Sequence, residues 1–214
     1  MIPIGGFIMA KAVIDTSVNV SLIKIDLRTA VIHVVGDSPL IVHKWSEKAK
    51  NEMLDKQMKK ASNGKTAKNP FRDYVESLYW MSECPETPTE EDIAKGHFGF
   101  PSTGFKASAV SAGYRAGITK DKVSTNGAFH IIGELVEIIG TPQSREDMVR
   151  IQMTTDIRYR AEFPKWEAYL NVRYNANVMS LDQIVNLFNL GGFATGVGEW
   201  RAEKGGSFGM YHVE

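Results

Sequence analysis

The 214-residue sequence has a single cysteine, no net charge and no long apolar run. Cys84 has no partner with which to form an intrachain disulfide, which fits a reducing compartment. Because 25 Lys and Arg residues balance 25 Asp and Glu residues, the chain does not bind polyanions through bulk charge, although a local basic face is compatible with this balance. Residues 1–9 lack a basic flank and no run is long enough to cross a membrane. We therefore expect a cytoplasmic protein.

Motifs for catalysis and cofactor binding are missing as well. Asp37 and Asp156 stand without a carboxylate or histidine cluster, and Cys84 has no partner thiol, so we expect no metal site. No serine or cysteine nucleophile is accompanied by a matched base. The sequence therefore predicts no cofactor and favours a protein that is not an enzyme.

Glycine, by contrast, is abundant near the end of the chain, where seven glycines fall within twenty residues: Gly191, Gly192, Gly196, Gly198, Gly205, Gly206 and Gly209. Such a segment either makes tight turns or presents N–H groups to an anion. It is not a P-loop, because Gly205 rather than Ser or Thr follows Lys204. Trp200, Arg201 and Lys204 are of the types that stack on bases and bind phosphates. A solvent-exposed loop with one buried Trp explains the same residues equally well.

Apolar periodicity and turn residues give an ordered series of expected core elements. These are a strand at 29–35, a helix at 103–116, strands at 128–139 and 166–174, a helix at 181–190 and a strand at 207–213. This βαββαβ order predicts a single α+β domain over residues 1–214 with a ferredoxin-like, or RRM-like, core.

Two segments are expected to be added to this core. Residues 43–98 are predicted to form a helical, lysine-rich insertion, with helices at 46–60 and 71–81 and a mobile loop at 61–69. Residues 145–163 are predicted to form a hairpin, in which strand alternation puts Arg158 and Arg160 on one face.

The N-terminal region carries two further expectations. The alternation of polar and apolar residues at 17–22 predicts a half-buried strand. The short apolar stretch at 1–9 is either a mobile arm or a strand that pairs with a neighbouring subunit.

Three segments in this order resemble a known family. They are Gly-Asp-Ser-Pro-Leu at 36–40, Phe-Pro-Ser-Thr-Gly-Phe-Lys-Ala-Ser-Ala at 100–109, and the glycines of 196–198 and 205–209. The chain here resembles the RAMP superfamily, the RNA-binding backbone subunits of CRISPR effector complexes and their relatives. The overall character of the sequence suggests a phage-encoded relative. The resemblance thus implies a bacterial cell, or one infected by a phage, as the location. The hairpin at 148–160 falls where such subunits insert the thumb that bends over bound RNA.

The resemblance implies a non-catalytic subunit that binds single-stranded nucleic acid, RNA in preference to DNA, and assembles head to tail along the strand. Such a protein needs only a local cluster of positive charge with aromatic stacking platforms. The candidate contacts are Lys44, Trp45, Lys106, Arg115, Arg150, Arg158, Arg160, Trp200, Arg201 and Lys204, together with the glycine loop (Gly196, Gly198, Gly205, Gly206 and Gly209).

Two other function classes stay open. The first is a metal-independent endoribonuclease, in which His43 acts as the general base and Lys44 stabilises the transition state. The second is a phage structural or counter-defence protein that acts through a protein interface. Net neutrality and the acidic segment at 83–92 favour the second alternative.

Overall fold

The structure is a computed structural model that describes residues 24–60, 67–151 and 154–214. The expected strand at 17–22, the apolar stretch at 1–9 and most of the expected loop at 61–69 lie outside the described residues.

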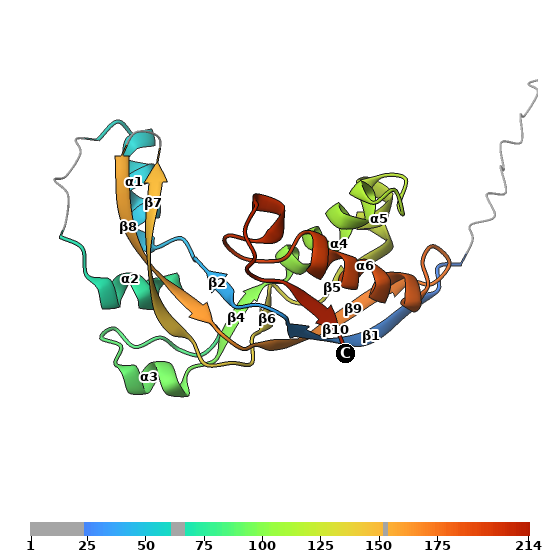
Figure 1. The fold of residues 1–214 in the computed structure, drawn as a ribbon, viewed down its shortest axis with the longest axis horizontal. Coiled ribbons are helices and arrows are strands. Elements are labelled where there is room, and N and C mark those ends of the chain that lie inside the picture. The colour runs from blue at the N-terminus through green and yellow to red at the C-terminus, as the bar shows by residue number, and fades with distance from the viewer. Residues whose placement is uncertain (1–23, 61–66, 152–153) are drawn as a thin grey trace, which may run out of the picture.

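The core is a four-stranded antiparallel sheet with two helices on one face (Figure 1). Its strands lie in the order β10 (Tyr211–Val213), β1 (Leu27–Gly36), β9 (Glu167–Asn175) and β5 (Phe129–Ile131). Helix α4 (Ser102–Arg115) connects β1 to β5 in the chain order of the core, and helix α6 (Leu181–Ala194) connects β9 to β10. If the four core strands are numbered 1 to 4 in chain order, their order across the sheet is 4-1-3-2. This order confirms the ferredoxin-like α+β fold.

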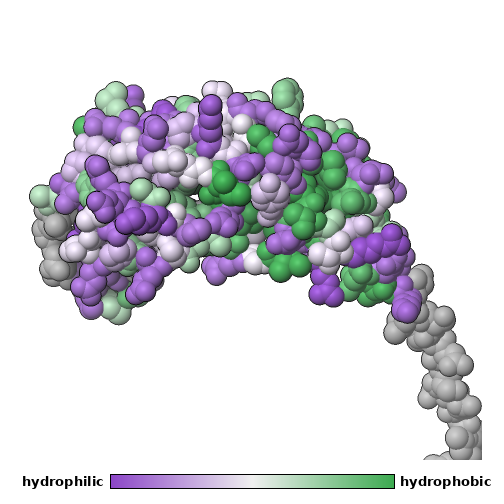
Figure 2. All heavy atoms as spheres, turned by 90° about the horizontal axis from the view of Figure 1, so that it is seen from below, coloured by the Kyte–Doolittle hydropathy of each residue, from purple (hydrophilic) through white to green (hydrophobic). Residues whose placement is uncertain are grey.

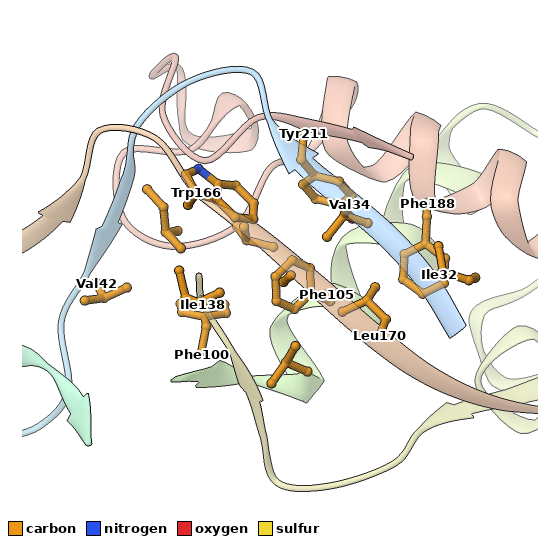
Figure 3. Packing of buried hydrophobic residues seen from close by; sticks show 14 of the residues in the cluster. Ile32, Val34, Val42, Phe100, Phe105, Ile138, Trp166, Leu170, Phe188 and Tyr211 are labelled. Carbon is orange, nitrogen blue, oxygen red and sulfur yellow. The ribbon is translucent and has the colours of Figure 1, made fainter. Parts of the chain in front are cut away.

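Burial alternates along the two central strands. Ile32 and Val34 of β1 are buried, as are Leu170 and Val172 of β9, whereas the residues between them face the other side of the sheet. Figure 3 shows several of these side chains packed together with Phe105, which comes from α4. The helices therefore cover one face of the sheet and leave the opposite face bare.

Helix α6 is longer than the sequence predicted and absorbs the first two glycines of the glycine-rich segment. It begins with a capping box, in which the Ser180 hydroxyl accepts from the Gln183 amide and the Gln183 side chain accepts from the Ser180 amide. It continues to Ala194, so Gly191 lies within its last turns. A Cβ atom at Gly191 would stand 2.8 Å from the Ala109 nitrogen of α4. This glycine therefore permits close packing of the two helices and does not belong to a loop.

The strand expected at 128–139 is divided in two. β5 ends at Ile131, and Gly133, in the left-handed region with φ 97°, turns the chain away from the core sheet. β6 (Leu135–Glu137) then joins a separate sheet of order β3-β4-β6, with β3 (Tyr79–Trp80) and β4 (Phe98–Pro101). The expectation of one continuous strand was wrong because a glycine turn interrupts an apolar run.

Two other expected elements are shorter than predicted. Helix α2 (Pro70–Ser77) ends before Leu78, whose extended backbone leads into β3, so the helix expected to reach residue 81 stops four residues earlier. β10 begins only at Tyr211, because Gly209 has a φ of 63° and its backbone turns there.

The hairpin consists of β7 (Gln143–Ile151) and β8 (Thr154–Phe163) and pairs with β2 (Leu40–Val42) in a third sheet. Helix α2 packs against β8, and the Ser77 hydroxyl accepts a 2.8 Å hydrogen bond from the Ala161 amide. In Figure 1 the hairpin, α1 (Glu47–Gln57) and α2 lie together at one end of the molecule, away from the core sheet.

The remaining helices are short. They are α3 (Glu90–Lys95), α5 (Lys122–Ala128) and the 3-10 turn η1 (Ala202–Lys204). Among the described residues, no helix combines the length and the apolar character that crossing a bilayer requires.

Candidate nucleic-acid interface

A cleft of about 670 Å³ lies between α4 and the segment that follows α6. Residues of α4, from Thr103 to Ser111, line one wall, and residues 195–199 with Arg201 and Glu203 line the other. His43 and Tyr79 reach the cleft from the insertion side, and Lys122 and Asn126 reach it from α5. The tertiary structure therefore brings His43, Lys106, Arg201, Gly196 and Gly198 into one site, although they come from three distant parts of the sequence.

Lys106 is the basic residue that α4 contributes to the cleft. Its Nζ atom donates to the Asn126 carbonyl oxygen at 2.7 Å and lies 3.2 Å from His130 Nδ1. It also lies 5.6 Å from the centroid of the Phe129 ring. Partial burial lowers the pKa of Lys106. These contacts hold a cation at the end of the cleft nearest α5.

The glycine loop serves packing more than anion binding. A Cβ atom at Gly198 would stand 2.4 Å from the Ile41 carbonyl oxygen, so only glycine allows the loop to lie against β2. The amides of Val197, Glu199 and Gly209 all donate to backbone carbonyls. Of the two roles that the sequence left open for these glycines, the tight turn is the one that the described backbone shows.

Arg201 and Arg115 share one carboxylate. Arg201 donates to Glu203 Oε2 through Nε at 3.0 Å and Nη2 at 2.9 Å, and its Nη1 donates to the Gly198 carbonyl at 3.2 Å. The Arg115 guanidinium donates to the other oxygen of Glu203. The hydrogen bond from Arg115, followed by that from Arg201, lowers the pKa of Glu203. This ion-pair cluster fastens the loop after α6 to the end of α4 and neutralises part of the positive charge expected at the cleft.

His43 lies at the mouth of the cleft that faces the hairpin. Its burial, and secondly the nearby Arg160 guanidinium, lower its pKa, while Glu199 opposes this shift. The imidazole is therefore neutral at pH 7, which leaves one ring nitrogen able to accept a proton.

One face of the hairpin carries charged side chains, which we call the charged face: Arg145, Asp147, Arg158, Arg160 and Glu162. Arg145 is paired across the ladder with Arg160, and Asp147 with Arg158, so these residues share one side of the two strands. Arg145 donates to Asp147 Oδ1 and to Glu162 Oε1, each at 2.9 Å. The guanidinium of Arg145 also stacks over the ring of Phe208, 4.7 Å away, which joins this face to the glycine loop.

Arg160 is the most enclosed member of the charged face. It is only 2% exposed, and its Nη1 atom lies 3.8 Å from Asp147 Oδ2 and 4.0 Å from Glu199 Oε2. Its Nε and Nη1 atoms are buried without a hydrogen-bond partner among the described residues. Arg158 is more exposed and lies 4.0 Å from the Asp156 carboxylate. Because Glu199 also lines the cleft, its contact with Arg160 connects the charged face to the cleft.

The other candidate contacts from the sequence lie outside the cleft lining. Trp45 is 60% exposed and Trp200 is 45% exposed, the latter with its backbone in the left-handed region at φ 54°. Lys204 and Arg150 are exposed, and the Lys44 amide donates to the Ser77 carbonyl at 2.9 Å. Gly205, Gly206 and Gly209 likewise do not line the cleft.

Sequence reasoning missed four polar residues of the site. Lys122 and Asn126 come from α5, a short helix capped by Asp121 that carries no nucleic-acid motif. Glu199 and Glu203 follow no recognisable motif, and their pairing with arginines depends on the tertiary contacts. In the described part of the chain, no cluster of three or more His, Cys, Asp or Glu residues is arranged to hold a metal ion.

The fold is a ferredoxin-like α+β fold, and the cleft lies between α4 and the loop after α6. A comparison with protein-family models and a comparison with curated protein sequences each give no match. Among solved structures, the chain is similar to Cmr6 from Pyrococcus furiosus, with 12% sequence identity and a TM-score of 0.41 over 88% of this chain and 99% of that chain.

Proposed function

We propose that the protein is a non-catalytic subunit that binds single-stranded nucleic acid, RNA in preference to DNA, and that copies of it assemble head to tail along the strand. The observation that supports this best is the cleft between α4 and the glycine loop. It gathers Lys106, Lys122 and Arg201 in one site. Trp200, beside Arg201, and Trp45, two residues after the cleft residue His43, are exposed aromatic side chains. The ferredoxin-like fold and the three RAMP-like segments favour RNA as the ligand.

The distribution of charge indicates how such a strand is held. Arg115 and Arg201 are already paired with Glu203, and the charged face of the hairpin pairs most of its arginines with its own carboxylates. Phosphate contacts therefore fall first to the lysines of the cleft, Lys106 and Lys122. Because only these two cations of the described cleft lining lack a carboxylate partner, we expect affinity to depend on salt only moderately.

Replacement of Lys106 by Ala tests this function. If Lys106 contacts a phosphate, affinity for short single-stranded RNA and DNA falls about tenfold for all sequences, because a charge-assisted contact is lost. The slope of log affinity against log salt falls by about 0.7, the value for one phosphate contact on a single strand. Fluorescence anisotropy at several salt concentrations measures both quantities.

The matched control is Lys95→Ala, since Lys95 is an exposed lysine of α3 that does not line the cleft. We expect this variant to bind as the wild type does. If both variants bind equally well, with melting temperatures unchanged, the cleft is not the nucleic-acid site and the protein-interface alternative gains support.

The neutral His43 at the cleft keeps endoribonuclease activity as the second candidate. A neutral imidazole can remove the proton from a 2′-hydroxyl, which is the step that a metal-independent ribonuclease requires. Incubation of end-labelled RNA with the wild type and with His43→Ala separates the two functions. We expect no cleavage by either protein, whereas cleavage that is lost in His43→Ala would make the protein an enzyme.

A further inference from the structure

The face of the core sheet opposite to α4 and α6, which we call the bare face, mixes aromatic, polar and basic side chains with apolar ones. Figure 2 views the molecule from that side and shows hydrophobic and hydrophilic residues next to one another. By strand alternation, the aromatic, polar and basic residues that the argument uses are Thr29, His33, His130, Tyr169, Asn171 and Arg173. Such a mixture on an open sheet is typical of a surface that stacks bases and binds phosphates.

Tyr169 is the aromatic platform of the bare face. Its ring lies parallel to the His33 imidazole, with the ring centroids 4.4 Å apart and an interplanar angle of 7°. The two residues are direct partners in the ladder between β1 and β9. Tyr169 remains 48% exposed, although His33 covers one side of its ring. A base can therefore stack on a ring whose orientation is already fixed, which lowers the entropic cost of binding.

The basic end of the bare face lies next to the cleft. His130 of the edge strand β5 and Arg173 of β9 are direct ladder partners. Lys106, which lines the cleft, reaches this edge, since its Nζ atom lies 3.2 Å from His130 Nδ1. Arg173 is exposed and has no ion-pair partner in the described part of the chain. A strand that leaves the cleft past Lys106 therefore meets a second free cation on the bare face.

Carboxylates limit the bare face at its other end. The His33 Nε2 atom lies 2.8 Å from Glu167 Oε2, and its Nδ1 atom lies 3.3 Å from Glu214 Oε2. Because carboxylates repel phosphates, a nucleic-acid strand should stop near Tyr169. Arg173 and Tyr169 are about 13 Å apart along β9, which matches about four bases at a stacked spacing of roughly 3.4 Å.

We infer that a single strand of nucleic acid held in the cleft continues past Lys106 and His130 onto the bare face, where Arg173 binds a phosphate and Tyr169 stacks on a base. The inference deepens the proposed function and rests on it, because the cleft supplies the first part of the path. Asn171 and Thr29 add donors and acceptors for base edges between the phosphate contact and the stacking platform.

Oligouridines of two lengths test the inference. One of about six nucleotides covers the cleft alone, and one of about 12 reaches the bare face as well. Fluorescence anisotropy measures the affinity of both for the wild type, Tyr169→Ala and Arg173→Ala. We expect each variant to bind the longer oligonucleotide about tenfold more weakly than the wild type does, and the shorter one equally well. Tyr169→Phe should bind the longer one as the wild type does, because the stacking ring remains.

Two further measurements sharpen this test. Phe71→Ala is the matched control, since Phe71 is an exposed aromatic residue of α2, away from the core sheet, and the variant should bind both lengths normally (Figure 1). Photo-cross-linking of the wild type to the longer oligonucleotide, substituted with 5-iodouridine, should label the peptide that contains Tyr169. This readout does not depend on the folding of a variant.

The outcomes separate the inference from the proposed function. Normal binding of the longer oligonucleotide by folded Tyr169→Ala and Arg173→Ala, or no cross-link at Tyr169, would overturn the inference and leave the bare face to a protein partner. The proposed function would still stand if Lys106→Ala weakened binding of the shorter oligonucleotide. A wild type that binds neither length would overturn both. Binding of the longer oligonucleotide that needs Tyr169 but not Lys106 would overturn the continuous path.

Discussion

In the core sheet, the side chains between strands and helices are apolar, and Leu170, Phe105 and Phe188 are fully buried there. On the charged face of the hairpin, the side chains turned towards the glycine loop are arginines and carboxylates, with Arg160 almost as inaccessible as the core leucines. Apolar packing depends little on salt or pH, whereas ion pairs depend on both. The core therefore fixes the fold, and the charged face is the part whose stability depends on salt and pH.

The largest expected effect is in the core. Leu170→Ala removes a fully buried side chain from the centre of β9 and should lower the free energy of unfolding by about 4 kcal/mol, through lost burial and the cavity left behind. Chemical denaturation measures this loss. The control is Val178→Ala, a residue 59% exposed after β9, which should change stability little. Equal stability of the two variants would show that the sheet is not the stabilising centre.

Arg160→Ala should have the next largest effect. The variant deletes a buried guanidinium and leaves Asp147 with one arginine fewer, which should cost about 3 kcal/mol. Arg160→Met keeps an apolar stem in the same place and should cost less than Ala, since it loses the charge but not the packing. If the two variants are equally destabilised, charge pairing dominates; if neither is destabilised, the charged face does not support the hairpin.

The smallest expected effect is the pH dependence of the glycine loop. The pKa of Glu203 is lowered from its ordinary value of 4.5 by Arg115 and Arg201, so more protons bind to this carboxyl in the unfolded chain than in the folded one. Its stabilisation is fully present above pH 4.5 and is lost as the pH falls through the lower pKa of the folded state. The hydrogen-exchange protection of residues 196–209, taken relative to the intrinsic exchange rate at each pH, should fall over this acid range.

Glu203→Gln removes the titrating group and is the control for that experiment. The variant should show faster exchange in the loop at neutral pH and a weaker dependence on acid. An acid response identical to that of the wild type would assign the titration to another carboxylate.

Much of the fold could be predicted because its signals are local. Alternation in β1 and β9, the capping box at Ser180 and the order of core elements all follow from neighbouring residues. The sequence-based predictions failed where one local pattern is compatible with two different tertiary structures. Gly191 could lie in a loop or at a helix crossing, and the apolar run at 128–139 could be one strand or two, until the packing partners were known.

The ferredoxin-like order of strands and helices follows from the amino-acid sequence alone, because periodicity and turn residues act over a few positions. Which polar residues meet depends on the tertiary fold. It brings His43, Lys106 and Arg201 into one cleft, pairs Arg115 with Glu203, and encloses Arg160 beside Asp147. Electrostatic effects depend on the distance between charges and on their exposure to water, and neither quantity is encoded at a single position in the chain.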